Sequence, residues 1–239
     1  MSALHRLRQA ALRLGVDLSR ASAAPPARHA RILRSHGIDL VLDVGANRGQ
    51  YASELRRYGY ADRICSFEPL PDAYRELARR AARDAGWSAL NHALGSHDGT
   101  ASLNVAGNAG ASSSILPMLD RHLEAAPDSE YVAVVEVPVR RLDTVWDEVM
   151  GAGSAPFLKL DVQGFEGEVL HGGGRALASL KGVQLEISLV PLYANALTLR
   201  DALDRATALG MRLVNLAPGF SDPRTGELLQ ADAVFMRDA

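Results

Sequence analysis

The chain has 239 residues and a formal net charge of −2, and 47% of its residues are hydrophobic, 23% charged and 5% aromatic. These values fit one soluble domain with a sizeable core and exclude a disordered chain, which combines low hydrophobicity with high net charge. No apolar run approaches the roughly 20 residues of a transmembrane segment, and the single cysteine, Cys65, excludes an internal disulfide or a multi-cysteine zinc site. We expect a cytoplasmic location, and the balanced charge gives no reason to expect nucleic-acid binding.

Residues 1–37 differ from the rest of the chain because they are rich in arginine and contain a single acid. Apolar side chains recur at helical spacing from Leu4 to Leu18, which predicts an amphipathic helix, and a second short helix is expected after the turn at Pro25-Pro26. Arginines interrupt the apolar residues, which excludes a secretory signal. Two interpretations stay open: this N-terminal helical extension covers the core with a solvated basic face, or it makes a peripheral contact with a membrane surface or an anionic substrate. Its apolar face would also suit a homodimer.

From residue 38 to residue 239, short apolar runs alternate with helical patterns. Helices are predicted at residues 50–58, 72–85, 166–178 and 198–209. Strands are predicted at residues 38–44, 63–67, 87–93, 100–105, 132–139, 157–162, 183–189, 211–216 and 231–236, the last two as a hairpin. Such alternation predicts one α/β domain over residues 38–239, with a mostly parallel sheet and helices on both faces.

Residues 106–130 show neither pattern and contain a run of three serines around Ser113. Irregular stretches of this length in a compact domain are often lids or binding loops. We therefore expect Ser113 to hydrogen-bond a cofactor or substrate, with a flexible polar linker as the alternative.

The first predicted strand runs straight into a glycine-containing turn, Asp43-Val-Gly-Ala-Asn-Arg-Gly49. In open α/β sheets, ligands bind beyond the carboxyl ends of the strands. Gly45 allows a sharp turn and the close approach of a ligand, Asn47 tolerates a left-handed backbone, and Gly49 leaves room for the next helix to pack on the sheet. This turn predicts a nucleotide-type site, and a packing turn that binds nothing is the alternative.

Asp43 indicates which nucleotide fits the turn. A dinucleotide-binding turn reads G-x-G-x-x-G, and a pyrophosphate here would meet the carboxylate of Asp43, an unfavourable like-charge contact. S-adenosylmethionine (SAM) has no phosphate, and it carries an ammonium that this acid can hold directly or through water. Glu68, at the end of the second predicted strand, is placed to accept both ribose hydroxyls, and Asn91 is expected near the adenine. The predicted cofactor-binding residues are Asp43, Gly45, Ala46, Asn47, Gly49, Tyr51, Glu68, Pro69, Asn91, Ala93, Ser113 and Asp161.

If SAM bound at this turn donates its methyl group, the transfer needs an aligned nucleophile and a group that takes one proton. Asp161, near the end of the strand predicted at residues 157–162, is the first candidate for the base or for orienting the acceptor hydroxyl; capping the next helix or holding the cofactor amine are its alternatives. Glu186 is a second catalytic candidate because an acid inside an apolar strand is costly to bury without a partner. His92 is the histidine we expect as a base.

Two further expectations concern the surroundings of Asp161. Lys159 alternates with Asp161 along the same strand, so both point to one face and Lys159 is expected to pair with an acid. Asp161 and Glu186 together could bind a divalent cation such as magnesium, although two carboxylates do not define a metal.

Six motifs follow one another along the chain: Asp43-Val-Gly-Ala-Asn-Arg-Gly49, Ser66-Phe-Glu-Pro69, Asn91-His-Ala-Leu-Gly95, Val137-Pro-Val-Arg-Arg-Leu-Asp143, Leu158-Lys-Leu-Asp-Val-Gln-Gly-Phe-Glu166 and Glu186-Ile-Ser-Leu-Val-Pro-Leu-Tyr193. Together they resemble the FkbM family of SAM-dependent methyltransferases from about residue 38 to the C-terminus. The resemblance implies a class I SAM-dependent methyltransferase (Rossmann-like) fold, with a mostly parallel seven-stranded sheet whose last strand is antiparallel. It also implies O-methylation of a hydroxyl, often on a sugar, glycoside or natural product.

The predicted function is therefore a SAM-dependent O-methyltransferase with a small hydroxylated acceptor. The alternatives are an N-methyltransferase and a SAM-binding or partner-binding domain without catalysis, while Asp43 disfavours a nicotinamide oxidoreductase. A nucleic-acid methyltransferase would need a basic cleft with aromatic residues around a flipped base, and the slightly acidic, aromatic-poor composition argues against one.

Overall fold

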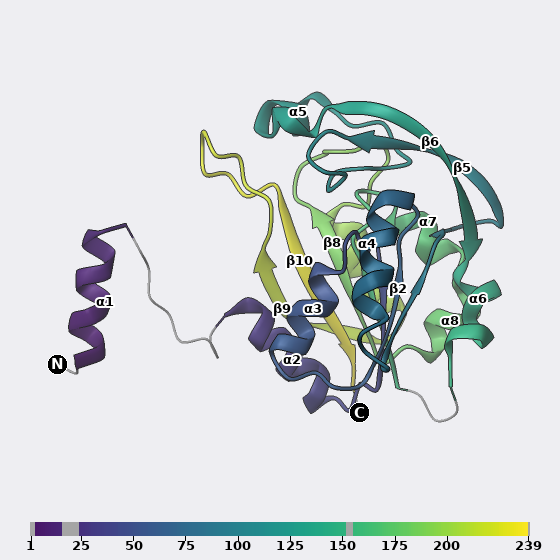
Figure 1. Ribbon diagram of the computed structural model, residues 1–239, viewed down its shortest axis with the longest axis horizontal. Helices are drawn as coiled ribbons and strands as arrows, with labels where there is room; N and C mark the ends of the chain where they lie inside the picture. Colours follow the sequence, from purple (N-terminus) through teal and green to yellow (C-terminus); the bar gives the residue numbers. More distant parts are fainter. Residues whose placement is uncertain (1–2, 16–23, 152–154, 239) are drawn as a thin grey trace.

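The computed structural model describes residues 3–15, 24–151 and 155–238. Its centre is a seven-stranded sheet in the order β3-β2-β1-β7-β8-β10-β9 (Figure 1). The strands of this sheet are β1 (Leu40–Val44), β2 (Arg63–Phe67), β3 (Trp87–Leu90), β7 (Pro156–Leu160), β8 (Gly182–Ser188), β9 (Met211–Pro218) and β10 (Gln230–Arg237).

Strand direction in the central sheet agrees with the expectation from the sequence. The strands β3, β2, β1, β7 and β8 pair in parallel, whereas β10, the last strand of the chain, is antiparallel to both β8 and β9. All residues of β1 and β7 are buried, as expected for parallel strands with helices on both faces. The prediction of a mostly parallel sheet with an antiparallel last strand is confirmed.

Two groups of helices cover the two faces of the sheet. On one face, α2 (Pro25–Ser35), α3 (Gln50–Arg57) and α4 (Pro71–Ala81) pack against Val41 and Phe157. On the other face, α6 (Leu142–Val149), α7 (Glu166–His171), α8 (Gly174–Ser179) and α9 (Leu199–Ala208) pack against Leu42 and Leu158. Neighbouring residues of a strand thus enter opposite cores, which follows from the two-residue period of side chains along a strand.

A second, smaller sheet lies beside the first and was not predicted as a separate unit. It consists of β4 (Ala93–Gly95), β6 (Tyr131–Arg141) and β5 (Gly99–Ala106), in that order. The strands expected at residues 100–105 and 132–139 are confirmed as its hairpin. The prediction of a single strand at residues 87–93 is wrong, because the chain leaves the central sheet after Leu90 and pairs with β6 from Ala93 onward.

Three helical segments also differ from the expectation. The helix predicted at residues 166–178 is two helices, α7 and α8, separated at Gly172 and Gly173. A Cβ on Gly172 would lie 1.9 Å from the carbonyl oxygen of Gly95 in β4, so the backbone packs directly against the second sheet there. The helix α6 was not predicted, and the stretch 106–130 contains α5 (Asp120–Ala125) and the short 3₁₀ helix η2 (Pro127–Ser129).

The N-terminal residues form two helices, as expected, of which α1 (Ala3–Arg13) ends before Leu18, a residue outside the described ranges. The helix α2 covers the core, since Ala30 and Leu33 on its inner side are completely buried. In α1, Leu7 and Leu12 are exposed. No helix within the described ranges has the length and apolar character needed to cross a lipid bilayer.

Candidate functional site

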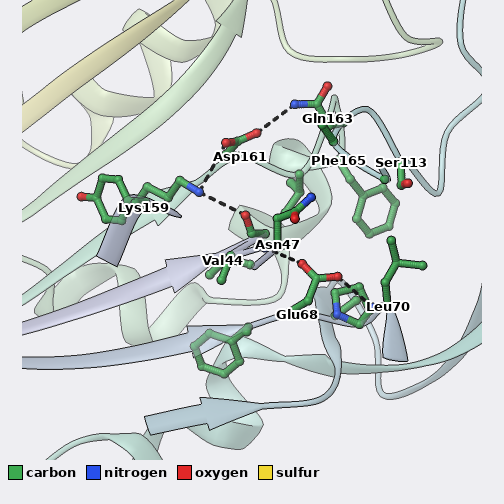
Figure 2. Close-up of a pocket in the computed structure, with 18 of the residues that line it drawn as sticks. Val44, Asn47, Glu68, Leu70, Ser113, Lys159, Asp161, Gln163 and Phe165 are labelled. Carbon is green, nitrogen blue, oxygen red and sulfur yellow. Dashed lines mark hydrogen bonds and ion pairs between the residues drawn. The ribbon is translucent and has the colours of Figure 1, made fainter. Parts of the chain in front are cut away.

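A cavity of about 320 Å³ opens beyond the carboxyl ends of β2, β1 and β7 and extends toward β8 and β10 (Figure 2). Its walls include most of the residues predicted to bind a cofactor: Gly45, Ala46, Asn47, Tyr51, Glu68, Pro69, Ala93, Ser113 and Asp161. Among the described residues, the wall does not include the other predicted site residues, which are Asp43, Gly49, Asn91, His92 and Glu186.

The glycine turn after β1 has the backbone that the sequence predicts. Gly45, Asn47 and Gly49 have φ angles of 76°, 46° and 84°, all in the left-handed region. A Cβ on Gly45 would lie 1.9 Å from the carbonyl oxygen of Asp161, and a Cβ on Gly49 would lie 2.8 Å from the ring of Trp87. The two glycines thus let the turn pack tightly against β7 and β3, which brings the backbone of residues 45–47 to the cavity.

Glu68 follows β2 and lies under the cavity with 5% of its surface exposed. Its two carboxylate oxygens accept hydrogen bonds from the backbone N–H groups of Asn47 and Leu70, at 2.7 and 2.8 Å. Burial raises the pKa of Glu68 to about 7. Each oxygen keeps a free lone pair, so this carboxylate can accept two further hydrogen bonds from a bound ligand. Asn91 lies outside the wall and donates to the backbone carbonyls of Glu68 and Pro69, which fixes the turn that carries the acid.

Polar residues form a row across four neighbouring strands of the central sheet. Ser66, Asp43, Lys159 and Gln184 are cross-strand neighbours in β2, β1, β7 and β8. The hydroxyl of Ser66 donates to Asp43 at 3.0 Å and accepts from the indole N–H of Trp87 at 3.0 Å. All four polar side chains are buried, so their mutual contacts replace the water that each would otherwise bind.

Lys159 is the centre of this row. Its ammonium lies 3.1 Å from Asp43, 3.4 Å from Asp161 and 3.2 Å from the carbonyl oxygen of Gly45. Burial works against its charge, but the carboxylates of Asp43 and Asp161 outweigh burial and hold the pKa of Lys159 above its ordinary value. The expectation that Lys159 pairs with an acid is confirmed. Because Asp43 is completely buried against this ammonium, Asp161 is the partner of Lys159 that faces the cavity.

Gln163 joins the two acids that the sequence singled out for catalysis. Its amide N–H₂ donates to Asp161 and to Glu186, at 2.8 Å each, and its amide oxygen accepts from the hydroxyl of Tyr193 at 2.6 Å. Glu186 also accepts from Gln230, and burial raises the pKa of Glu186 well above its ordinary value. A backbone φ of 53° turns Gln163 toward these partners. Figure 2 shows its amide beside Asp161 at the cavity.

The geometry between Asp161 and Glu186 does not fit a magnesium ion. Magnesium takes oxygen ligands, whereas the group shared by these carboxylates is the amide N–H₂ of Gln163, a hydrogen-bond donor. In the part of the chain that the structure describes, no group of three or more His, Cys, Asp or Glu side chains could hold a metal ion. We therefore derive no metal-assisted step.

The serines of the stretch 106–130 hold this stretch against the site. Ser114 donates to the carbonyl oxygen of Gln163 at 2.7 Å, and the carbonyl oxygen of Ser112 accepts from Tyr193 at 3.3 Å. Ser113, the predicted binding residue, lies in the cavity wall and accepts from the backbone of Ala106. These contacts hold residues 112–114 against the residues of the site.

His92 lies in a buried position beside the cavity. Its ring packs on Phe67 with a centroid distance of 5.4 Å, and Phe67 lines the cavity. Its Nδ1 contacts the carbonyl oxygen of Ala93 at 3.1 Å, while Nε2 has no hydrogen-bond partner among the described residues. Burial lowers the pKa of His92. The lowered pKa favours the neutral ring, and the contact with Phe67 links this ring to the cavity wall.

The sequence reasoning missed several polar residues of the cavity wall, which are Gln50, Glu54, Gln184 and Asp232. A cue was present for two of them, since Gln184 and Asp232 are polar residues inside otherwise apolar strands, and a buried polar group requires a partner or a function.

The strand order, the glycine turn after β1 and the buried acid after β2 define a class I SAM-dependent methyltransferase fold. Residues 43–214 match the family described as methyltransferase FkbM domain, and the chain belongs to this family. The family membership predicted from the six motifs is thereby confirmed.

Two relatives and one solved structure illustrate the similarity. Methyltransferase sdnD of Sordaria araneosa is 31% identical over an alignment that covers 55% of this chain and 59% of the relative. The 2-O-methyltransferase NoeI of Sinorhizobium fredii (strain NBRC 101917 / NGR234) is 25% identical over 69% of this chain and 70% of the relative. Fibrillarin of Aeropyrum pernix, solved with bound SAM, has a TM-score of 0.47 and 12% identity over 83% of this chain and 66% of its own.

Proposed function

We propose that the chain transfers the methyl group of SAM to a hydroxyl of a small sugar, glycoside or natural-product acceptor. The main support is one cavity that runs along the sheet edge from Glu68, after β2, to Asp232 in β10. In this proposal the methyl donor lies at the Glu68 end of the cavity and the acceptor at the Asp232 end. The name of the rhizobial relative, a 2-O-methyltransferase, supports oxygen as the methyl acceptor.

The residues at the Glu68 end fit the adenosine of SAM. The carboxylate of Glu68 can accept both ribose hydroxyls, and Leu70, Leu94 and Phe165 offer an apolar slot for the adenine. Asp161, held by Lys159 and Gln163, is placed to bind the ammonium of the methionine part. When bound, SAM supplies a methyl group that is electrophilic because it is attached to a positively charged sulfur.

The protein then has to orient the acceptor hydroxyl, exclude water and take one proton. Orientation starts with a rigid frame, because Gln163 ties Asp161, Glu186 and Tyr193 to one another. The fastened serine stretch closes the same side of the cavity. In this proposal Glu186 is a positioning residue that acts through Gln163.

Binding of the methyl donor is tested by isothermal titration with S-adenosylhomocysteine (SAH), with NADH as the comparison. We expect micromolar binding of SAH alone, and we expect Glu68→Ala to weaken it. Asp204→Ala, at an exposed position of α9, is the control and should bind like the original chain. NADH binding in place of SAH would overturn the cofactor assignment.

Transfer is tested with isotope-labelled SAM, a panel of methyl glycosides and the corresponding amino sugars. Labelled methyl ethers support the proposed function, and labelled amines would point to an N-methyltransferase instead. SAH binding without any transfer would leave a SAM-binding domain without catalysis, which contradicts the proposal.

A further inference from the structure

A second cavity, of about 100 Å³, lies between the start of α2 and the strands β9 and β10. It shares four wall residues with the first cavity: Tyr51, Glu54, Gln184 and Asp232. The two cavities therefore meet at these side chains. A ligand that passes this junction reaches from the methyl-transfer site to α2.

The walls of the second cavity have the chemistry of a carbohydrate site. Pro25, Pro26 and the ring of His29 offer flat apolar surfaces, and Asn215 and Gln184 offer amides that both donate and accept. Burial lowers the pKa of His29 to about 4, so the ring is neutral at pH 7, and it is held by Tyr51 at 2.7 Å. A pyranose presents apolar C–H faces and hydroxyls at its rim, which matches this combination.

The charges in this cavity select against anionic ligands. Glu54 and Asp232 are its ionisable acids, and the wall residues described include neither lysine nor arginine. A phosphorylated or carboxylated ligand would meet two negative charges without a cation to offset them, so the walls favour a neutral ring with several hydroxyls.

Asp232 stands out among the three acids on this face of the sheet. Asp161 has one oxygen bonded to Gln163 and the other beside Lys159, and Glu186 lies outside both cavity walls and is bonded to two amides. Asp232 forms a side-chain hydrogen bond with Gln184 and lines both cavities. Its remaining acceptor sites thus lie at the junction where an acceptor hydroxyl must be placed.

The other groups around Asp232 keep its pKa above the ordinary value. Burial is the largest cause, the negative charge of Asp161 adds to it, and the amide of Gln184 and the ammonium of Lys159 oppose it. A raised pKa makes a carboxylate a better proton acceptor. The titratable groups that face Asp232 from the surrounding elements are His29 on α2, Tyr51 and Glu54 on α3, Lys159 on β7, Asp161 just after β7 and Glu186 on β8.

We propose that the second cavity holds the non-reacting part of a neutral sugar acceptor, and that Asp232 is the catalytic base that takes the proton of the methylated hydroxyl. The hydroxyl oxygen bonds to the transferred methyl carbon, its proton passes to a carboxylate oxygen of Asp232, and the sulfur keeps the electron pair of the broken carbon–sulfur bond. This inference rests on the proposed function. It concerns residues such as His29 and Asp232 that lie outside the part of the chain matched to the family, residues 43–214.

Asp232→Asn tests the base, with Asp204→Asn, at an exposed position of α9, as the matched control. We expect Asp232→Asn to bind SAH normally and to lower kcat by about 100-fold or more. We also expect it to lose the rise of kcat with pH, at saturating SAM and acceptor, that we expect of the original chain. The control should behave like the original chain in all three measurements. An Asp232→Asn variant with normal kcat and an unchanged pH profile overturns the role of Asp232.

Ala217→Trp tests the cavity without touching an ionisable group. Ala217 lines the second cavity, and its neighbour Leu216, exposed by 48%, points to the other face of the edge strand β9, so Leu216→Trp is the control. The readout is saturation-transfer NMR with the panel of methyl glycosides, recorded on the SAH complex. We expect glycoside signals with the original chain and Leu216→Trp, and their loss with Ala217→Trp. Signals that persist in Ala217→Trp, or no signal from any glycoside with the original chain, overturn the cavity assignment.

These measurements separate the inference from the proposed function. If SAH binds and methyl ethers form, but neither Asp232→Asn nor Ala217→Trp has an effect, the proposed function stands and the inference fails. If SAH does not bind, the proposed function fails, and the NMR comparison of Ala217→Trp with Leu216→Trp on the free chain still decides whether the second cavity binds sugars.

Discussion

At the scale of single residues, the site depends on buried charges that are held by few partners. Glu68 is a carboxylate with backbone N–H donors on both oxygens, and Lys159 is an ammonium between two carboxylates. Both are nearly inaccessible to water, so removing a partner leaves a charge that water cannot solvate. Titration and substitution of these groups should therefore have large, measurable effects.

We expect SAH to bind more tightly as the pH rises from about 6 to about 8. The pKa of Glu68 is about 7 in the free protein, so below this pH a proton must leave before the carboxylate can accept two ribose hydroxyls. As the pH rises from 4.5 to about 7, the free energy of unfolding of the free protein should fall. The reason is that the carboxyl group of Glu68 loses its proton at a lower pH in the unfolded state than in the folded state. Titration calorimetry across this range checks the affinity, and Glu68→Gln should bind weakly with no such pH dependence. Equal affinity at both ends of the range would contradict the assignment.

Lys159→Met should lower the free energy of unfolding by about 3–5 kcal/mol, because Asp43 would keep a buried charge without its cation. The double variant Lys159→Met/Asp43→Asn removes both charges, and we expect it to regain part of the loss. Urea unfolding of the three proteins measures both effects. An equal loss in the single and the double variant would show that the ion pair is not the cause.

At the scale of helices and strands, a close backbone contact sets a helix boundary that the hydrophobic pattern alone did not predict. The break between α7 and α8 occurs where Gly172 meets Gly95 of β4. The same contact joins the small sheet to the helices of the central one. The sequence predicted residues 166–178 as helical only in part, and the tertiary contact at Gly172 sets where the helix is interrupted.

Gly172→Ala should lower the free energy of unfolding by about 1–3 kcal/mol, because a methyl group there would overlap the carbonyl oxygen of Gly95. Gly174→Ala is the matched control: its nearest contact would be 3.8 Å away, at an ordinary distance. Chemical denaturation of both variants provides the comparison. If both substitutions have the same effect, the break has another cause.

Strands of the central sheet were predictable because their apolar runs are short, continuous and bounded by turns. The helix α6 was missed although Leu142, Val145, Trp146 and Val149 have helical spacing and are buried, because it begins immediately after the long strand β6. Within the site, Gly45 and Glu68 could be placed because each directly follows a strand. Asp232 could not, since its position depends on the insertion of the antiparallel strand β10 between β8 and β9, which a single sequence pattern does not specify.

At the scale of the whole molecule, α2 packs with the methyltransferase domain as part of one folded core. Leu33 of α2 is completely buried in the same core cluster as residues of α3 and β1. The helix also provides one side of the second cavity. The N-terminal extension thus has two parts, of which α2 is structural and, in our proposal, also contacts the acceptor.

A pair of leucine substitutions tests this division. Leu33→Ala should lower the free energy of unfolding by about 2–5 kcal/mol, because it leaves a cavity in a fully buried position. Leu12→Ala in α1 removes a side chain that is 49% exposed and should leave the stability unchanged. Thermal and urea unfolding of the two variants gives the answer. A silent Leu33→Ala would mean that α2 does not belong to the folded core.

The row of polar residues across the sheet also provides the protein with an intrinsic optical probe. The indole N–H of Trp87 is bonded to Ser66, Ser66 to Asp43, and Asp43 is paired with Lys159 at the cavity. The same indole ring packs under Gly49 of the glycine turn. A ligand that changes the charge pair of Asp43 and Lys159, or the glycine turn, should therefore change the electric field at the indole ring of Trp87. We therefore expect the fluorescence emission of Trp87 to change with occupancy of the site, without any attached label.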